Sequence, residues 1–364
     1  MKAAVMRAVG EPLTIEDVTL AEPGPLEVVI RVAAAGLCHS DLRYMEGSYE
    51  IPLPAIMGHE SAGVVEEVGT AITHVVPGDH VVTSLSVFCG ACSYCLSDRP
   101  HLCRNREATQ RGDGELPRLS VGGEPLHQCL NLASFAERML VHENALVKIT
   151  RKMPLDRAAL LGCGVATGLG AVFNTAEVRH GEAVAVIGCG GVGLGAIQGA
   201  RIAGADTIIA IDRIDEKLQL AKTLGATHLI NTTMDDAVAR VHAITESFGV
   251  HHAFEAVGST STAELAFALL RRGGTATIIG LIPAGQVRVP SDELFWEKKL
   301  QGSVMGSNRF RIDTPRYVDM YLDGRLNLDE MVSDRLGLSE INEGFARMQT
   351  GQVAREIVVF DPME

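Results

Sequence analysis

The sequence has little of what marks an exported, membrane-spanning or nucleic-acid-binding protein. Its start, Met1 to Arg7, lacks the apolar core and cleavage pattern of a signal peptide, so we expect a cytoplasmic protein. The longest weakly polar stretch, Ala183 to Gln198, is rich in glycine and too short for a membrane span. The net charge is −13, and Lys and Arg form no cluster of the kind that holds a phosphate backbone. We therefore expect neither a membrane nor a nucleic acid as a partner.

Aromatic residues are scarce too, at 4% with one tryptophan, whereas glycine is abundant at 38 residues. A hydrophobic fraction of 46%, made largely of Val, Ala, Leu and Ile, is typical of a compact globular chain with many tight turns. At 364 residues the chain is long enough for two domains of ordinary size, each of which can bury its own core.

Two different patterns divide the chain. Up to about residue 147, short alternating runs such as Val28–Val32 and Ser61–Val65 are separated by Gly, Pro and Asp turns, which predicts a mostly β part. Further on, apolar runs alternate with amphipathic segments, which predicts a parallel α/β sheet. The strands expected in this sheet are Ala183–Ile187, Thr207–Ile211, His228–Ile230 and Thr275–Ile279. Near the end we expect a helix at Asp313–Leu322 and a strand at Glu356–Phe360.

A glycine-rich sequence follows the first of these expected strands. Gly188-Cys189-Gly190-Gly191-Val192-Gly193 opens an apolar helix candidate, which is the context that the GxGxxG pattern requires. Gly188 permits the tight turn, Gly190 lets the backbone approach a pyrophosphate, and Gly193 allows close packing of helix on strand. The free N–H groups at the helix start favour an anion. The motif predicts a dinucleotide site, with a ligand-free strand–helix turn as the alternative.

Asp212 ends the next expected strand, at about the offset where an acidic residue accepts the ribose hydroxyls of a dinucleotide. An acid there disfavours a 2′-phosphate, so we expect NAD rather than NADP. Arg213, which follows directly, is a residue type that could tolerate a phosphate. Lys217, a few residues further on, is a further candidate contact of the cofactor.

Four of the eight cysteines crowd into one short segment. They are Cys89, Cys92, Cys95 and Cys103. Four soft ligands at this spacing fit a closed tetrahedral zinc site, which has no open position for a substrate and therefore predicts a structural role. A disulfide pair is the alternative interpretation.

Further candidate ligands are scattered over three segments. They are Cys38-His39-Ser40-Asp41, Gly58-His59-Glu60 and Leu161-Gly162-Cys163-Gly164. Each one alone is weak evidence, because a lone buried Cys usually behaves as a small hydrophobic residue and a lone His more often satisfies a structural hydrogen bond. Their joint arrangement is what suggests a second metal site.

In this order the motifs closely resemble those of the zinc-containing medium-chain alcohol dehydrogenases, over essentially the whole chain. The resemblance implies an α/β fold with a β-rich part. Residues 1–164, with residues 305–364 returning to them, would form a GroES-like catalytic domain. Residues 165–304 would form a Rossmann domain with a doubly wound parallel sheet, and the active site would lie in the cleft between the two. The long segment Arg104–Gln128 accompanies homodimers in this family.

The resemblance also implies the reaction and its metal. Cys38, His59 and Cys163 would bind the catalytic zinc, and the four-cysteine segment would bind a second zinc ion in each subunit. The reaction is hydride transfer between an alcohol carbon and C4 of the nicotinamide of NAD, which interconverts an alcohol with an aldehyde or ketone. The family often carries a histidine where this chain has Arg43, and an always-protonated guanidinium cannot act as a base. The proton must therefore leave through water or by another route.

Three polar residues beside the implied ligands receive roles from the same resemblance. Ser40 would take the alcohol proton into a relay, and Glu60 would lie close enough to the metal to help ligand exchange. Asp41 would support the zinc site as a partner of a ligand, without binding the metal itself. The alternative is that Asp41 is an ordinary helix-cap residue.

The remaining implied residues contact the coenzyme and the substrate. His39 and Arg355 match positions that contact the coenzyme pyrophosphate. Leu85, Phe135 and Leu281 match positions that line the alcohol pocket, and an apolar lining suits a medium-sized, aromatic or branched alcohol. Cys129 and Cys189 match no ligand position and are expected to be structural.

Three alternatives stay open. Arg104–Gln128 resembles the branch of the family that oxidises a thiol adduct of formaldehyde, such as S-hydroxymethylglutathione. A non-catalytic zinc-stabilised NAD-binding protein and a zinc-free quinone or enoyl reductase are the others. Cys38, Ser40, His59 and Cys163 speak against both, because neither class needs three metal ligands and a hydroxyl.

Overall fold

The computed structural model describes residues 1–112, 114–351 and 355–360 of the chain, which folds into two compact units. Unit 1 consists of Met1–Cys163, Arg309–Asp323 and Val332–Glu364, and unit 2 of Gly164–Asn308 and Gly324–Met331. Unit 2 therefore extends past the predicted domain boundary at residue 304, to Asn308, and also includes the later segment Gly324–Met331. Side-chain hydrogen bonds account for this: Asn308 Nδ2 donates to the Ala166 carbonyl at 2.7 Å, and Gln198 bonds both the N–H and the carbonyl of Asn327.

Unit 1 is built on one large β-sheet. Its strands, in order across the sheet, are β12 (Leu146–Ile149), β7 (His80–Thr83), β6 (Ser61–Val68), β4 (Glu27–Gly36), β20 (Glu356–Val359) and β19 (Asp334–Leu336), and β11 (Arg138–His142) also pairs with β4. The long strand β4 is buried over almost its full length because its Val, Ile and Ala side chains face apolar neighbours on both sides.

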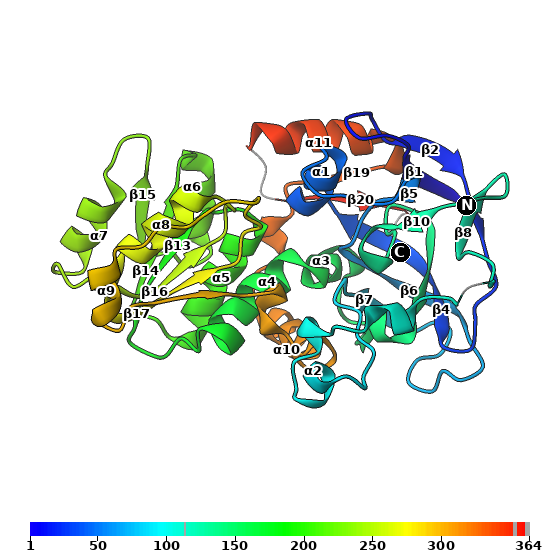
Figure 1. Cartoon of the computed structure of the whole chain (residues 1–364), viewed down its shortest axis with the longest axis horizontal. Helices are drawn as coiled ribbons and strands as arrows, with labels where there is room; N and C mark the ends of the chain where they lie inside the picture. The colour runs from blue at the N-terminus through cyan, green and yellow to red at the C-terminus, as the bar shows by residue number, and fades with distance from the viewer. Residues whose placement is uncertain (113, 352–354, 361–364) are drawn as a thin grey trace. The chain divides into compact units, whose positions relative to one another are not determined.

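Two smaller sheets and five α-helices complete the described part of unit 1. The first sheet contains β10 (His127–Gln128), β5 (Ala55–Ile56), β1 (Lys2–Met6) and β2 (Thr14–Asp17), and the second contains β3 (Thr19–Leu20), β8 (Leu119–Val121) and β9 (Glu124–Pro125). The helices are α1 (His39–Met45), α2 (Ser93–Leu96), α3 (Leu155–Ala159), α10 (Phe310–Leu322) and α11 (Ile341–Thr350). Figure 1 shows α1 directly after the end of β4, in the blue part of the chain.

Unit 2 is a six-stranded parallel sheet with helices between its strands (Figure 1). Its order is β15 (His228–Asn231), β14 (Thr207–Asp212), β13 (Ala183–Ile187), β16 (Val250–Glu255), β17 (Leu270–Ile278) and β18 (Lys299–Gly302). The helices are α4 (Gly164–Gly170), α5 (Gly191–Ala203), α6 (Asp215–Thr223), α7 (Ala237–Ile244), α8 (Thr260–Ala268) and α9 (Ser291–Phe295). This is the doubly wound strand order: successive strands are added on one side of the first strand, β13, and then, from β16 on, on its other side. Dinucleotides bind at the point where the order switches. The predicted α/β fold with a β-rich part is confirmed.

In the part of the chain that the structure describes, no single helix is long and apolar enough to cross a membrane. One pair of consecutive helical segments, Leu155–Gly162 and Gly164–Thr175, is long and apolar enough when the two are taken together, but the pair is bent at the break between them. Leu160, Leu161 and Leu169 in this pair are fully buried within the protein, as in core helices.

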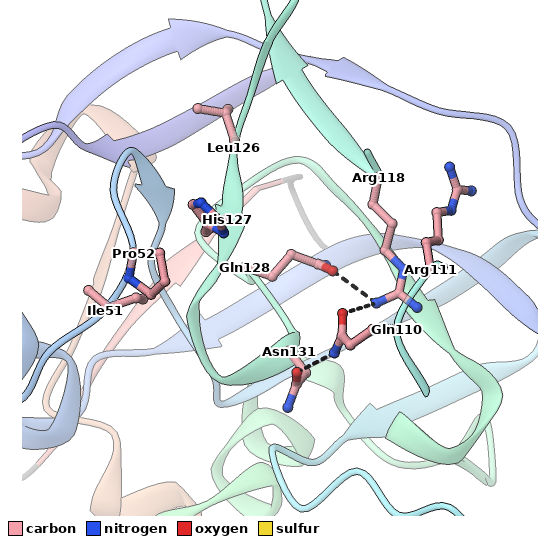
Figure 2. A pocket seen from close by; sticks show the side chains of 9 residues that line it. All are labelled: Ile51, Pro52, Gln110, Arg111, Arg118, Leu126, His127, Gln128 and Asn131. Atoms are coloured by element: carbon pink, nitrogen blue, oxygen red, sulfur yellow. Dashed lines mark hydrogen bonds between the residues drawn. The ribbon is translucent and has the colours of Figure 1, made fainter. Parts of the chain in front are cut away.

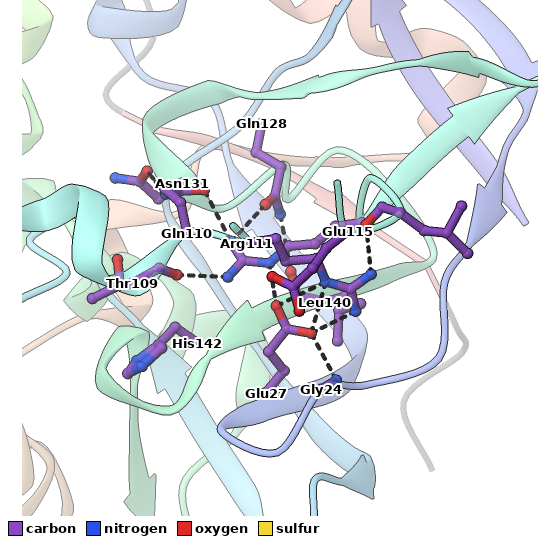
Figure 3. Close-up of polar contacts among 12 residues, drawn as sticks. Gly24, Glu27, Thr109, Gln110, Arg111, Glu115, Gln128, Asn131, Leu140 and His142 are labelled. Carbon is purple, nitrogen blue, oxygen red and sulfur yellow. Dashed lines mark hydrogen bonds and ion pairs between the residues drawn. The ribbon is translucent and has the colours of Figure 1, made fainter. Parts of the chain in front are cut away.

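A buried ion-pair network holds the long segment Arg104–Gln128 against β4 (Figure 3). The carboxylate of Glu27 accepts hydrogen bonds from Arg111 Nη2 and Arg118 Nε, both at 2.6 Å, and from the N–H of Gly24 at 2.8 Å. Burial alone would raise the pKa of Glu27, but the hydrogen bonds from Arg111, Gly24 and Arg118 lower it to about 2. Glu27 therefore stays ionised and anchors the segment at neutral pH.

Glu27→Gln should remove this anchor and leave two guanidinium groups with no counter-ion. We expect the free energy of unfolding at pH 7 to fall by about 3 kcal/mol. Because the folded-state pKa lies below that of the unfolded chain, the Glu27 contribution is complete above pH 4.5 and is lost as the pH falls towards 2. Urea unfolding of parent and variant at pH 7 and at pH 3 should show the gap narrowing, and a gap of constant size would contradict this account. Glu124→Gln, in an exposed ion pair, is the control and should change little.

Candidate metal and dinucleotide sites

The four-cysteine segment of unit 1 brings its thiols together. The ligand atoms of Cys89, Cys92, Cys95 and Cys103 all lie within 4.8 Å of one another, with Sγ–Sγ distances of 3.5 Å (92 to 95) and 3.9 Å (89 to 95, 92 to 103). A tetrahedron of sulfurs about 2.3 Å from a zinc ion has edges of about 3.8 Å. These distances fit such a site, and all eight cysteines are free thiols, so the disulfide interpretation was wrong.

The segment has no apolar core of its own. The helix α2 that carries Cys95 has no buried residue, and Leu96 is 75% exposed. Backbone N–H groups of Ala91 and Cys92 point at Cys89 Sγ at 3.4 and 3.3 Å, as they do around thiolates. The pKa of Cys92 is lowered to about 6 by backbone amides, whereas burial raises that of Cys95 to about 12. A bound cation would allow all four sulfurs to be thiolates at once.

The second set of ligands comes from three distant segments of unit 1. Cys38 precedes α1, His59 precedes β6, and Cys163 follows a short 3₁₀ helix, Leu160–Gly162. Their ligand atoms lie within 4.8 Å of one another, and all three residues are buried. The pKa of Cys38 is held well below its usual value because Cys163 donates a hydrogen bond to its thiolate and the positive charge of Arg355 attracts it. The environment therefore suits a cation beside an anionic sulfur.

The orientation of His59 is fixed by a buried carboxylate. His59 Nδ1 lies 3.0 Å from Asp41 Oδ1, which also accepts the N–H of Gly58 at 3.0 Å, so Nδ1 carries the proton. The other ring nitrogen, Nε2, is buried and has no hydrogen-bond partner among the described residues. An uncompensated buried imidazole nitrogen is costly, whereas a metal ion satisfies it. Gly58 itself has φ +94°, and a Cβ there would lie 2.7 Å from the backbone N of Phe135.

Three polar contacts of this cluster were not predicted from the sequence. Arg355 Nη2 pairs with Glu60 Oε2 at 3.3 Å, and Nη1 donates to the Leu37 carbonyl at 2.8 Å, all in buried surroundings. Cys129, predicted to be a structural residue, points its thiol at Asp41 Oδ1 at 3.9 Å. All three contacts join residues far apart in sequence, so no local motif signals them.

The other predicted residues of this region lie near the cluster or in the core. Ser40 Oγ lies 3.7 Å from Cys38 Sγ, and the neighbouring His39 is exposed. Phe135 is fully buried and packs edge-on against Phe345, with ring centroids 5.9 Å apart. Leu85 packs partly buried against the same core, whereas Leu281 belongs to unit 2 and is 52% exposed.

The glycine-rich turn of unit 2 joins β13 to α5 as predicted. Gly188 has φ +93°, and a Cβ on Gly193 would lie 1.7 Å from the Gly188 carbonyl oxygen, so only glycine fits there. A Cβ on Gly190 would meet nothing within 4 Å, which leaves its backbone open to a ligand. Asp212 ends β14 and accepts the N–H of Cys189 at 2.7 Å, so its carboxylate lies beside the turn. Arg213 and Lys217 follow on the loop and on α6.

Comparisons with known proteins agree with this geometry. The family "Alcohol dehydrogenase GroES-like domain" matches residues 24–151, and "Zinc-binding dehydrogenase" matches residues 191–322. The chain is 36% identical to an S-(hydroxymethyl)glutathione dehydrogenase of Paracoccus denitrificans and 37% identical to an alcohol dehydrogenase class-3 of Cereibacter sphaeroides, and each match covers 99% of both chains.

Solved structures give the same result. An alcohol dehydrogenase zinc-binding domain protein from Burkholderia ambifaria has a TM-score of 0.94 at 37% identity, and benzyl alcohol dehydrogenase from Acinetobacter calcoaceticus has 0.93 at 31%, each covering 99% of both chains. A putative zinc-binding dehydrogenase from Sinorhizobium meliloti, bound to NADP, has a TM-score of 0.83 at 28% identity over 98% of both chains.

Asp41→Asn should weaken metal binding by the three-ligand cluster, because it removes the charge that orients His59. Losses of about 10- to 100-fold in metal affinity are usual when such a partner is replaced. The measurement is zinc retained after dialysis against graded concentrations of a chelator, where the variant should lose one equivalent earlier than the parent. Asp17→Asn, at an exposed site, is the control. Retention equal to that of the parent would show that Asp41 does not support the site.

Proposed function

The chain belongs to the zinc-containing medium-chain alcohol dehydrogenase family, and from that premise we propose that Cys38, His59 and Cys163 hold the catalytic zinc of an NAD-dependent alcohol dehydrogenase. The enzyme is a zinc-dependent oxidoreductase that acts on an alcohol or aldehyde and uses a nicotinamide dinucleotide. The observation that carries the proposal is the buried His59 Nε2, which has no partner among the described residues and lies within reach of two cysteine sulfurs. Cys89, Cys92, Cys95 and Cys103 would hold a second, structural zinc.

The zinc would supply a Lewis acid that lowers the pKa of the alcohol hydroxyl, and NAD would supply the ring that exchanges the hydride. Ser40 places a hydroxyl beside Cys38, where it receives the proton of the substrate. Asp41 keeps His59 in the tautomer whose Nε2 is a ligand. Glu60, paired with Arg355, provides a carboxylate beside the ligands for their exchange. Arg43 is always protonated, so the proton leaves from Ser40 through water.

Several residues would hold the coenzyme. The turn from Gly188 to Gly193 would receive the pyrophosphate, and Asp212 would accept the ribose hydroxyls, which favours NAD over NADP. Arg213 and Lys217 would lie beside the adenosine end. His39 and Arg355 would contact the pyrophosphate from unit 1, although the guanidinium of Arg355 already donates two of its hydrogen bonds within that unit.

The substrate we propose is a medium-sized aromatic or branched alcohol. Leu85 offers partly buried apolar surface in unit 1 and Leu281 is an exposed apolar side chain of unit 2, whereas Phe135 is fully buried in the core of unit 1. The likeness to benzyl alcohol dehydrogenase favours an aromatic ring. The second candidate is a thiol adduct of formaldehyde, which the likeness to the S-(hydroxymethyl)glutathione dehydrogenase of Paracoccus denitrificans favours.

A steady-state screen tests class, coenzyme and substrate together. Benzyl alcohol should be turned over faster with NAD than with NADP. With NAD, it should also be turned over faster than ethanol and faster than formaldehyde in the presence of glutathione. Cys163→Ala should lose at least about 10³-fold in turnover, since its cluster loses a ligand, while NADH binding measured by fluorescence stays unchanged. Turnover of the variant near the parent rate would remove Cys163 from the mechanism. Turnover of formaldehyde only when glutathione is present would favour the second candidate.

The enzyme would act in the cytoplasm, where eight free cysteines are kept reduced, on small molecules rather than on a membrane or a nucleic acid. The net charge of −13 supports the last point. Fractionation of cells would test the location, and activity found outside the cytoplasm would overturn it.

We propose a homodimer that continues the sheet of unit 2. Its edge strand β18 has one unpaired side, and apolar side chains lie exposed on and near it. They are Phe295, Trp296, Leu300 and Val304. A second copy related by a two-fold axis could pair with this edge and bury these side chains, which removes an exposed strand edge.

Leu300→Lys should separate the two copies, because it places a charge at the centre of the proposed contact. Light scattering after size exclusion should give twice the 38.8 kDa chain mass for the parent and 38.8 kDa for the variant. Val76→Lys, on an exposed loop of unit 1, is the control and should remain a dimer. A parent of single mass, or a variant of double mass, would contradict the pairing through β18.

A further inference from the structure

Unit 1 contains a hollow of about 320 Å³ that includes none of the metal-cluster residues. Figure 2 shows its lining: Arg111, Arg118 and three amide side chains lie on one side, and Ile51, Pro52 and Leu126 contribute apolar surface. Its volume is at the lower end of the range of small-molecule sites. The proposed dehydrogenase reaction makes no use of it.

The charge beside this hollow is positive. Arg111 and Arg118 both pair with the carboxylate of Glu27, so two guanidinium groups share this one carboxylate (Figure 3). None of the described lining residues carries a carboxylate. A negatively charged group entering the hollow would therefore meet an attractive field in partly buried surroundings, where screening by water is weak.

The orientation of the three amides follows from Arg118, because a guanidinium only donates hydrogen bonds. Arg118 Nη1 donates to Gln110 Oε1 at 3.3 Å and to Gln128 Oε1 at 3.1 Å, so both amide nitrogens point away from it. Gln128 Nε2 then donates to the carbonyls of Leu132 and Leu140. Gln110 Nε2 donates to Asn131 Oδ1. This series of hydrogen bonds ends at Asn131.

Asn131 therefore offers its amide nitrogen as a pair of donors. Its oxygen accepts from Gln110, and its Nδ2 has no hydrogen-bond partner among the described residues. Arg118 uses four of its five N–H groups, on Glu27, Gln110, Gln128 and the Thr109 carbonyl, and so keeps one more donor. The unused N–H groups of Asn131 and Arg118 can bind a ligand that brings hydrogen-bond acceptors.

We propose that this hollow binds the carboxylate of a small organic acid, with Asn131 Nδ2 as the donor that recognises it and Ile51, Pro52 and Leu126 packing against its apolar part. The site is independent of the proposed dehydrogenase reaction, and it would bind its ligand whether or not that reaction is confirmed. Gln128 and Asn131 flank Cys129, whose thiol contacts Asp41, so an occupant would lie beside the support of His59.

Binding can be followed locally through His127, an exposed side chain that lines the hollow (Figure 2). The zinc-loaded enzyme would be titrated with sodium benzoate, and separately with neutral benzamide, while the imidazole resonance of His127 is recorded by NMR at constant ionic strength. A benzoate that binds only at the metal cluster would leave this resonance unchanged. We expect saturable shifts with benzoate and at least about tenfold weaker binding of benzamide, which lacks the charge.

The decisive variant is Asn131→Asp. Asn131 has φ +67°, a conformation that aspartate also tolerates, and a carboxylate can still accept the hydrogen bond of Gln110, so the fold is retained. The variant loses both donors and repels the ligand, so benzoate affinity should fall at least about tenfold while kcat for the alcohol stays unchanged. Gln219→Glu, an exposed change of the same charge in unit 2, should bind like the parent. No saturable shift of His127, equal binding of benzamide, or parent-like binding by Asn131→Asp would each overturn the proposal.

Discussion

The structure of the candidate active site depends on one hydrogen bond between two fully buried side chains, which His59 donates to Asp41. The carboxylate fixes which imidazole nitrogen carries the proton and turns the other towards Cys38 and Cys163. Its own position is set by α1, which begins where β4 ends, and by the N–H of Gly58. The fold of unit 1 thus converts three weak, separate sequence signals into one ligand set, and a bound cation would satisfy the charges that burial otherwise makes costly.

Charge compensation and steric limits also account for the other sites of the molecule. The four-cysteine segment has no buried apolar residue in its helix, so a metal ion would take the place of a core there. The segment after it is held by Glu27, whose carboxylate pairs with the buried Arg118 and the partly buried Arg111 beside the hollow. In unit 2 the constraint is steric, because Gly193 lies too close to Gly188 for any side chain. Each site follows from a local requirement of charge or space.

Sequence alone predicted what depends on residue type and short spacing. The glycine-rich turn, the four-cysteine cluster and the strands β13 to β15 were found because their patterns are local, whereas the set Cys38, His59 and Cys163 was implied only by the family resemblance. Strand β16 was missed, since His251 and His252 interrupt its apolar pattern, and β18 was missed because most of its residues are exposed. The Glu60–Arg355 and Asp41–Cys129 contacts join segments that only the fold brings together. Phe135 was predicted to line the pocket and is fully buried against Phe345, because an apolar residue type does not separate a pocket from a core.

The central claim is that Cys38, His59 and Cys163 bind one metal ion. A crystal structure of the purified enzyme, with anomalous diffraction recorded on both sides of the zinc absorption edge, tests it directly. The account predicts an anomalous peak at bonding distance from Cys38 Sγ, His59 Nε2 and Cys163 Sγ, in addition to one among the four cysteines. A map of fully active enzyme with a peak at the four cysteines and none at His59 Nε2 would contradict it.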